Sequence, residues 1–211
     1  MLYDQAMISM AYLEAYELTN NKEYAEIAEE IFAYVLRDMT DEKGGFYSAE
    51  DADSEGEEGK FYVWTNEEIV KILGDKDGEK FIDIFGFEDQ GNFHDEATRQ
   101  LTGSNIPYLK NKLSKYAKKN DLDIGKLKNT IEENRLALFS HRKKRIHPLK
   151  DDKVLTDWNG LMIAALANGG KILENDKYIN AAENAANFIL NNLKDDNGRL
   201  FKRYRKGSSG L

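Results

Sequence analysis

The sequence of 211 residues contains no cysteine, only two prolines and only three histidines. Without cysteine the chain forms no disulfide and offers no thiolate to a metal, which fits a reducing, cytoplasmic compartment. No apolar run approaches the roughly 20 residues that span a bilayer, so no membrane association is expected. The first residues also lack the basic and then apolar pattern of a signal peptide.

Acidic residues outnumber basic ones, and the formal net charge is -8. This balance argues against nucleic acid as a partner. The basic run at residues 141–145 ends a predicted helix, where cations are favoured by the helix dipole. Phosphate-binding glycine loops, HExxH motifs and nucleophile elbows are absent, so neither a cofactor nor a catalytic metal is expected.

Four segments show helical spacing and fall into two pairs. Residues 3–18 and 158–173 are apolar almost all round, which predicts two inner, mostly buried helices. Residues 22–37 and 177–193 carry an apolar stripe opposite a polar face, which predicts two outer helices with one face in water. Each inner helix with the outer helix that follows it forms an αα-hairpin.

The two hairpins are an internal repeat. From the outer helix onward they align at a constant offset of 154 residues, so that Tyr24 matches Tyr178 and Asp41 to Gly44 match Asp195 to Gly198. Hairpins of this kind bury their inner helix only by stacking with others into a solenoid or ring. We therefore predict an all-α fold, an incomplete (α/α) toroid over residues 1–206 that is a fragment of a longer protein, with a flexible tail at 207–211. Its open apolar edge would favour self-association.

The region between the hairpins is less regular. Thr65 to Glu68 form a capping box that opens a short helix closed by Gly74, and residues 79–85 predict another short helix. Residues 86–105 are predicted to be loop. Helical pattern resumes near Pro107, breaks at 120–121 and runs again over 126–144.

An acidic segment is the most informative stretch of the chain. Six acids lie within residues 50–58, and aromatic residues flank them at 46–47 and 61–64. These flanks predict two short antiparallel strands that carry an acidic tip. Carboxylates so close together repel one another, so water, a cation, basic side chains or a ligand rich in hydroxyls must stabilise them.

Three motifs carry a family resemblance: LYDQAM at 2–7, GGFYSAEDADSEG with EGKFYVW at 44–64, and DDKVLTDWNGLMI at 151–163. Together they resemble the YyaL / spermatogenesis-associated protein 20 family over essentially the whole chain. The resemblance implies a longer protein, in which a thioredoxin-like domain precedes a helical toroid. That toroid is similar to N-acylglucosamine 2-epimerases and six-hairpin glycosidases, so a thioredoxin-like domain and a sugar-like molecule are the expected partners.

Glycoside chemistry needs two carboxyl groups on opposite sides of a sugar, one as acid and one as base or nucleophile. The catalytic candidates are Glu50, Asp51, Asp53 and Asp152. Aromatic side chains offer stacking surfaces for sugar rings, and helix starts offer backbone N–H groups to bound oxygens. The predicted substrate-binding residues are therefore Tyr3, Asp4, Tyr47, Trp64, Trp158 and Asn159. We expect the acidic tip to face one cavity with Asp4 and Trp158.

Several alternatives stay open at this stage. Residues 51–56 imitate the start of an EF-hand loop, but Tyr62 stands where the bidentate glutamate is required, which leaves at most a looser calcium or magnesium site. A solvated acidic turn is the simplest explanation of the same residues. For epimerase chemistry, His147 is the better general base of the histidines.

Two functions follow. The first is a carbohydrate-active enzyme of the glycoside hydrolase or sugar epimerase type. The second is a non-catalytic interaction module for a thioredoxin-like domain. A sugar site should be concave and lined by carboxylates and accessible aromatics, whereas a platform should bury the aromatics and leave the acids in open water.

Overall fold

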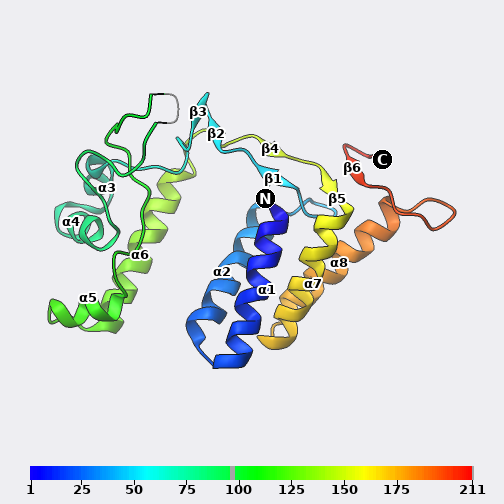
Figure 1. Cartoon of the computed structure of the whole chain (residues 1–211), viewed down its shortest axis with the longest axis horizontal. Coiled ribbons are helices and arrows are strands. Elements are labelled where there is room, and N and C mark those ends of the chain that lie inside the picture. The colour runs from blue at the N-terminus through cyan, green and yellow to red at the C-terminus, as the bar shows by residue number, and fades with distance from the viewer. Residues whose placement is uncertain (96–97, 211) are drawn as a thin grey trace. The chain divides into compact units, whose positions relative to one another are not determined.

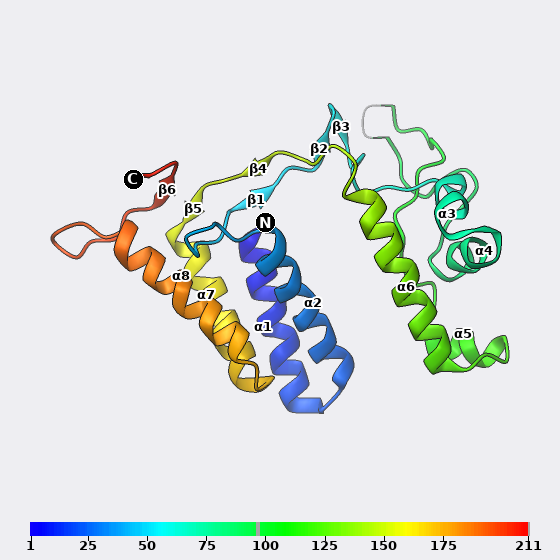
Figure 2. The same cartoon turned by 180° about the vertical axis from the view of Figure 1, so that it is seen from behind.

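Two helical hairpins lie side by side in the computed structural model, which describes residues 1–95 and 98–210 (Figure 1). The first consists of α1 (Leu2–Thr19) and α2 (Lys22–Asp38), and the second of α7 (Thr156–Ile172) and α8 (Asp176–Asn192). Helix α1 packs directly against α7, as Figure 2 also shows from behind. These hairpins and the strands beside them form one unit, residues 1–50 with 150–210, which we call unit 1.

The repeat predicted at an offset of 154 residues is confirmed. Helices α2 and α8 begin and end at matching positions, and each begins after an asparagine, Asn21 or Asn175, whose side chain accepts a hydrogen bond from the backbone two residues on. The turns that follow also match, because Thr40 bridges Phe46 just as Lys194 bridges Leu200.

The matching turns have the same internal bonds. The carboxylates of Asp41 and Asp195 each accept a hydrogen bond from the backbone two residues later, at Lys43 and Asn197. A glycine with positive φ follows in each turn. Sequence similarity in this region therefore reflects a shared backbone geometry of the kind that aspartate and glycine favour.

The expectation that residues 3–18 form a mostly buried helix is wrong. Only one face of α1, with Leu2, Ala6, Ser9 and Leu13, is buried. On the rest of α1, apolar side chains remain in water, and the exposed fractions are 53% for Met7, 47% for Ile8 and 85% for Leu18. The physical reason is that α2 and α7 both pack against α1 but leave its remaining surface without a packing partner among the described helices. An exposed apolar face of this kind was expected of an open edge.

Close helix packing in unit 1 depends on a glycine. A Cβ atom added at Gly169 on α7 would lie 2.4 Å from the ring of Phe32 on α2, which is itself fully buried. At Gly160, on the same helix, an added Cβ atom would meet nothing within 4 Å. Gly169 thus leaves room for the Phe32 ring against α7, whereas a side chain at Gly160 would meet nothing.

Gly169→Ala is expected to lower the free energy of unfolding by about 1–3 kcal/mol, because the new methyl group overpacks the core against Phe32. Gly160→Ala serves as the matched control and should be neutral or stabilise by up to about 1 kcal/mol, through helix propensity alone. Urea unfolding of both variants checks this. Equal stability of the two variants would contradict the close packing described here.

Within the described residues, three small antiparallel sheets complete the fold. Strand β1 (Ala49–Glu50) pairs with β4 (Lys150–Asp151), β5 (Val154–Leu155) pairs with β6 (Arg203–Arg205), and β6 pairs with β7 (Ser208–Gly210). The fourth pairing joins β2 (Asp53–Ser54) to β3 (Glu57–Glu58). Residues 207–210, for which the composition predicts a flexible tail, thus contribute to the β6–β7 hairpin, and Leu211 lies outside the described residues.

The predicted strands around the acidic tip are wrong. Phe46 forms a bridge with Thr40, and Trp64 forms one with Asn105, so the two aromatic flanks do not pair with each other. The hairpin instead lies within the acidic tip, where β2 and β3 are joined by Glu55 and Gly56, both with positive φ. The aromatic flanks go into cores, since Phe46, Phe61 and Trp64 are buried.

Residues 51–149 form a second unit, which we call unit 2. It contains the β2–β3 hairpin, α3 (Asn66–Leu73), α4 (Asp75–Ile84), α5 (Leu113–Lys119) and α6 (Ile124–Arg142). The capping box of Thr65 and Glu68 and the end of α3 at Gly74 are confirmed. Helix α4 begins four residues before its predicted start. In the described part of residues 86–105, which excludes 96 and 97, the backbone forms neither helix nor strand beyond isolated bridges.

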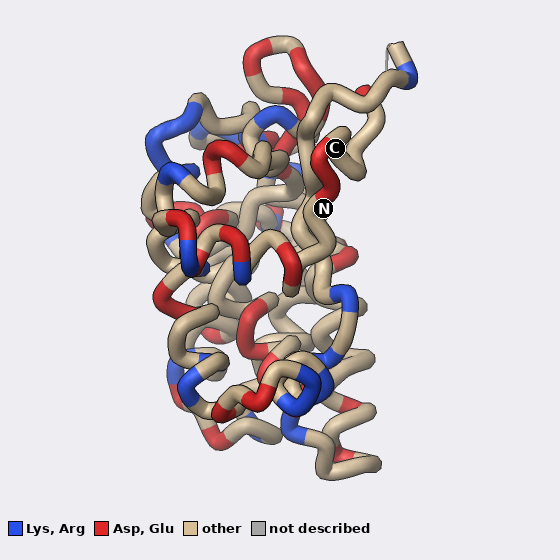
Figure 3. The backbone as a smooth tube through the Cα atoms, turned by 90° about the vertical axis from the view of Figure 1, so that its left-hand side faces the viewer, with Lys and Arg blue, Asp and Glu red and all other residues tan. Residues whose placement is uncertain are grey.

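The fold is therefore mostly helical with small antiparallel sheets. Within the described residues, none of the helices is long and apolar enough to cross a membrane. Acidic and basic residues are interspersed along most of the backbone (Figure 3). Whether both units belong to one toroid domain over residues 1–206 stays a prediction.

Candidate functional site

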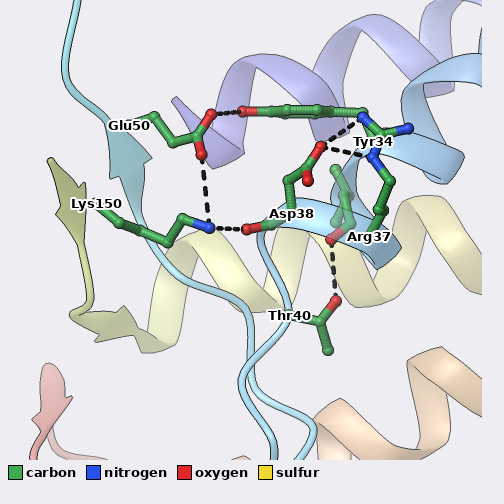
Figure 4. Close-up of polar contacts among 7 residues, drawn as sticks. Tyr34, Arg37, Asp38, Thr40, Glu50 and Lys150 are labelled. Carbon is green, nitrogen blue, oxygen red and sulfur yellow. Dashed lines mark hydrogen bonds and ion pairs between the residues drawn. The ribbon is translucent and has the colours of Figure 1, made fainter. Parts of the chain in front are cut away.

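Glu50 is the centre of a polar network in unit 1 (Figure 4). The Tyr34 hydroxyl on α2 donates a hydrogen bond of 2.7 Å to its carboxylate, and the Lys150 ammonium on β4 lies 3.5 Å from the other oxygen. Lys150 also donates to the backbone carbonyl of Asp38 at the end of α2. With its side chain only 13% exposed, Glu50 ties the β1–β4 pair to α2.

Two aspartates at the end of β4, Asp151 within the strand and Asp152 just after it, have basic partners. The Asp151 carboxylate lies 3.1 Å from the Lys153 ammonium, and Asp152 forms an ion pair with Arg205 on β6. Partial burial tends to raise the pKa of Asp151, but hydrogen bonds from Lys153 and Ser48 outweigh it and lower this pKa below its usual value. The stability that Asp151 contributes is therefore present at neutral pH and is lost as the pH falls through that lowered pKa.

An aromatic pair lies at the starts of α1 and α7. The rings of Tyr3 and Trp158 meet edge to face with centroids 4.8 Å apart, a favourable geometry for aromatic contacts. Asp4 is close in sequence, and its carboxylate lies 3.4 Å from the amino group of Met1. Tyr3 and Trp158 are both partly exposed, so the pair remains accessible from solvent.

Asn159 has a different environment from its neighbour Trp158. Its side chain is fully buried, and its amide accepts a hydrogen bond from the Phe46 N–H at 2.8 Å. The same amide donates to the carbonyls of Phe46 and Leu155, each at 2.9 Å. Asn159 therefore holds the chain just before the acidic segment against the start of α7, and both of its N–H groups are engaged in doing so.

Tyr47 packs beside the repeated turn and donates a hydrogen bond of 3.1 Å to the Asp41 carboxylate. Burial, together with the charge and hydrogen bonding of Asp41, raises the pKa of the Tyr47 hydroxyl to about 12. This hydroxyl stays protonated across the physiological range. It can donate a hydrogen bond but is unsuited to act as a general base.

From Asp51 onward the acidic tip belongs to unit 2 and is stabilised by local bonds. The Asp51 carboxylate accepts a hydrogen bond from the backbone N–H of Asp53, and both residues are exposed. Lys60 lies 2.8 Å from Glu57 and 3.7 Å from Glu55. The hydrogen bond to Glu57 raises the pKa of Lys60. Basic side chains thus relieve part of the repulsion.

Beside this hairpin, unit 2 has an open cleft of about 650 Å³. Carboxylates reach the cleft from separate segments: the hairpin, the start of α3 and the loop around residue 95. The acidic lining residues are Glu55, Glu57, Glu58, Glu68 and Asp95, and the aromatic ones are Phe61, Trp64 and Phe93. We call this the acidic cleft.

Arg145 holds the wall of the acidic cleft together. Its guanidinium donates to the carbonyls of Phe61 and Val63 at 2.9 and 2.7 Å, lies 3.1 Å from the Glu68 carboxylate and stacks over the Trp64 ring at 4.1 Å. With its side chain only 18% exposed, this cation fixes the backbone that follows the acidic tip. The sequence interpretation of residues 141–145 as charges at a helix end did not reveal this role, because Arg145 lies beyond the end of α6 and acts on a segment distant in sequence.

The predicted site residues are divided between the two units. Unit 1 contains Tyr3, Asp4, Tyr47, Glu50, Asp152, Trp158 and Asn159, and unit 2 contains Asp51, Asp53 and Trp64. Trp64 lines the acidic cleft, whereas Asp51 and Asp53 are not among its lining residues. That the acidic tip faces one cavity with Asp4 and Trp158 stays a prediction.

The remaining candidates have weaker support. The exposed ring of His147 packs at a tilt against that of Phe61 with centroids 4.5 Å apart, so it lies near the acidic cleft without lining it. His94 forms an isolated bridge with Leu101. Over residues 1–95 and 98–210, three or more histidine, aspartate or glutamate side chains are nowhere grouped as a metal ion would require.

Comparison with known proteins shows that the sequence of this chain is similar to segments of longer proteins. It is 34% identical to spermatogenesis-associated protein 20 of Homo sapiens over 228 aligned residues, which cover all of this chain and 29% of that protein. The protein of the same name from Mus musculus is 32% identical over the same coverage, and an uncharacterised protein of Caenorhabditis elegans is 33% identical over 227 residues. The chain thus spans about 29% of the length of the first of these relatives, and the family resemblance carried by the three motifs is confirmed.

Two further comparisons add little. No family model matches the chain. A cellobiose 2-epimerase from Bacillus thermoamylovorans aligns with 99% of this chain and 65% of its own, at 13% identity and a TM-score of 0.28. At this TM-score the likeness supports neither a fold nor a ligand.

Proposed function

Since this chain is homologous over its whole length to a segment of spermatogenesis-associated protein 20, we propose that it is part of a carbohydrate-active (α/α) toroid that binds a sugar-like molecule at the acidic cleft. The toroid, its glycoside hydrolase or sugar epimerase type and a cytoplasmic location are elements of this proposal. The acidic cleft is the single observation that carries it.

The acidic cleft has the features that a site for a polyhydroxylated ligand needs. Its volume of about 650 Å³ lies within the range of ligand pockets, roughly 300–1,000 Å³. Carboxylates such as Glu57 and Glu68 accept hydrogen bonds from hydroxyl groups, and Lys60 and Lys144 at the same cleft donate them. Phe93, which is partly exposed, supplies apolar surface for the face of a sugar ring, whereas Phe61 and Trp64 line the cleft as buried side chains.

The proposed catalytic carboxylates remain Glu50, Asp51, Asp53 and Asp152. Asp51 and Asp53 belong to the same unit as the acidic cleft; Asp51 lies just before its hairpin, and Asp53 is the first residue of β2. Glu50 and Asp152 have cationic partners, Lys150 and Arg205, that hold each carboxylate in a fixed position. A ligand large enough to be cleaved or epimerised would need one of these groups beside its anomeric or C2 carbon.

A thermal-shift screen of the chain against monosaccharides and disaccharides tests the proposal. A sugar that binds only the native state at about 100 times its Kd stabilises by roughly 2.7 kcal/mol and raises Tm. The double variant Glu57→Gln, Glu58→Gln should remove most of that shift, because it deletes two charged acceptors from exposed positions. Glu183→Gln, an exposed substitution on α8, is the matched control and should leave the shift unchanged.

The variants Asp51→Asn and Asp53→Asn separate binding from chemistry. They should leave the fold intact and keep the thermal shift, while any turnover of the sugar identified in the screen is lost. If no sugar raises Tm, or if the double glutamine variant keeps the full shift, the acidic cleft is not the binding site.

The exposed apolar face of α1 favours the second function, a non-catalytic interaction module. Met7, Ile8 and Leu18 leave about half or more of their surface in water, and apolar patches commonly mark interaction sites. The partner proposed from the family resemblance is a thioredoxin-like domain. Ile8→Asp should abolish the association of this chain with that thioredoxin-like domain in sedimentation velocity if this face is the interface.

A further inference from the structure

Unit 2 has a second groove, of about 310 Å³, that the proposed sugar site does not use. Its floor is apolar and rigid, because Trp64, Phe81 and Leu138 belong to one buried core cluster and are at most 6% exposed. The Phe81 ring stacks on that of Phe85 with centroids 4.3 Å apart. We call this the aromatic groove.

One wall of the aromatic groove is an exposed tyrosine that the backbone fixes in place. Tyr108 is 51% exposed, yet its N–H donates a hydrogen bond of 3.0 Å to the Phe85 carbonyl. Its ring lies so close to Gly86 that an added Cβ atom there would be 2.4 Å from the ring. Leu109, which is 50% exposed, extends the same wall. Large apolar side chains are thus held in water beside a preformed groove.

The opposite wall is α6, which brings positive charge to the aromatic groove. Arg135 and Arg142 both line it and lie two helical turns apart, about 10 Å along the axis. Arg135 makes a bidentate ion pair with Glu132. The Arg142 guanidinium carbon lies 5.4 Å from the ring centroids of Phe61 and of Tyr62 and 5.8 Å from that of Phe139. A planar guanidinium matches a carboxylate edge to edge.

From these features we propose that the aromatic groove binds a small aryl carboxylate, with its ring between Tyr108 and the aromatic floor and its carboxylate at Arg142. The volume fits a molecule of one or two rings and is at the low end for ligand pockets. A sugar is a poorer occupant, because this lining offers mainly apolar and aromatic surface and few acceptors. The cationic wall selects an anion over a neutral hydrocarbon.

Trp64 lines both the aromatic groove and the acidic cleft, and the chain has only one other tryptophan, Trp158. The variant Trp158→Phe therefore makes tryptophan emission a direct report on Trp64. In this background 3-phenylpropionate should change the emission saturably. The neutral 3-phenylpropanol should bind with an affinity at least about tenfold lower, since it lacks the charge-assisted hydrogen bonds.

Arg142→Met keeps an apolar stem but removes the charge. It should lower the affinity for 3-phenylpropionate about tenfold and leave the affinity for 3-phenylpropanol unchanged. Tyr108→Ala removes the exposed wall and should lower the affinity of the groove for both probes. Arg203→Met, an exposed arginine of unit 1, is the matched control and should change neither. Tm values recorded in parallel show whether each variant remains folded.

Three results would overturn the proposal: no saturable response to 3-phenylpropionate, equal affinity for the acid and the alcohol, or unchanged affinity in folded Arg142→Met. A response to an amphipathic acidic peptide with none to 3-phenylpropionate would also overturn it, and would assign the groove to a protein partner. None of these outcomes depends on a sugar binding to the acidic cleft.

Discussion

Arg145→Ala is expected to lower the free energy of unfolding by about 3 kcal/mol, because removing one member of a largely buried polar network leaves the others desolvated and unpaired. The carbonyls of Phe61 and Val63 lose their donor, Glu68 loses its cation and Trp64 loses its stacking partner. Arg145→Lys should recover only part of this, since a compact ammonium group lacks the planar face that stacks on Trp64 and the forked N–H groups of a guanidinium. Urea unfolding monitored by tryptophan fluorescence measures both variants.

Lys144→Ala is the matched control for Arg145, since Lys144 is the exposed neighbour and should change stability by no more than about 0.5 kcal/mol. If Arg145→Ala were as stable as Lys144→Ala, the wall of the acidic cleft would not depend on Arg145. In that case the shape of the cleft would have to come from packing alone.

Asn159→Ala is the second large effect, with an expected loss of about 3 kcal/mol. The buried N–H and C=O groups of Phe46 would lose their partner, and each unsatisfied buried group costs roughly 1–3 kcal/mol. Asn159→Asp should also destabilise, because a carboxylate cannot donate to the carbonyls of Phe46 and Leu155. Thermal and urea unfolding of the variants test this.

Asn168→Ala provides the comparison on the same helix, because Asn168 is exposed near the other end of α7. It should be neutral, or slightly stabilising through helix propensity. Should Asn159→Ala unfold at the same urea concentration as Asn168→Ala, the hydrogen bonds of Asn159 to Phe46 would contribute nothing net to stability.

The repeat could be predicted because it depends on short-range chemistry. Helix periodicity, the asparagine caps and the Asp41 and Asp195 turns are all encoded within a few residues, so the offset of 154 residues appears again in helix bounds and turn bonds. The capping box of Thr65 and Glu68 could be predicted for the same reason.

The strands could not be predicted because their partners are remote. Ala49 and Glu50 pair with residues 150–151, about a hundred positions away, and sequence alone does not specify that partner. Phe46 and Trp64 have strand propensity, but such propensity measures the fit to a half-buried surface, and here both side chains are in cores.

The exposure of α1 and the additional first turn of α4 depend on how neighbouring helices pack and not on the local sequence pattern. Met7 and Ile8 look like core residues, yet packing covers only the opposite face of α1. Gly78 discourages a helix by propensity, but it lies where an added Cβ atom would be 2.8 Å from the backbone of Val70 on α3, so close packing of α3 and α4 compensates. Arg145 was missed for the same reason, since its partners lie some 80 residues earlier.

The two tryptophans permit the most direct test of sugar binding at the acidic cleft. Trp64 lines that cleft in unit 2, and Trp158 lies beside Tyr3 in unit 1, so their indole N–H signals in a ¹⁵N-labelled chain report on the two predicted aromatic sites separately. Titration with a sugar that raises Tm should shift the Trp64 indole signal together with the backbone amides of residues 55–68. A shift confined to Trp158, or no shift of either indole, would contradict binding at the acidic cleft.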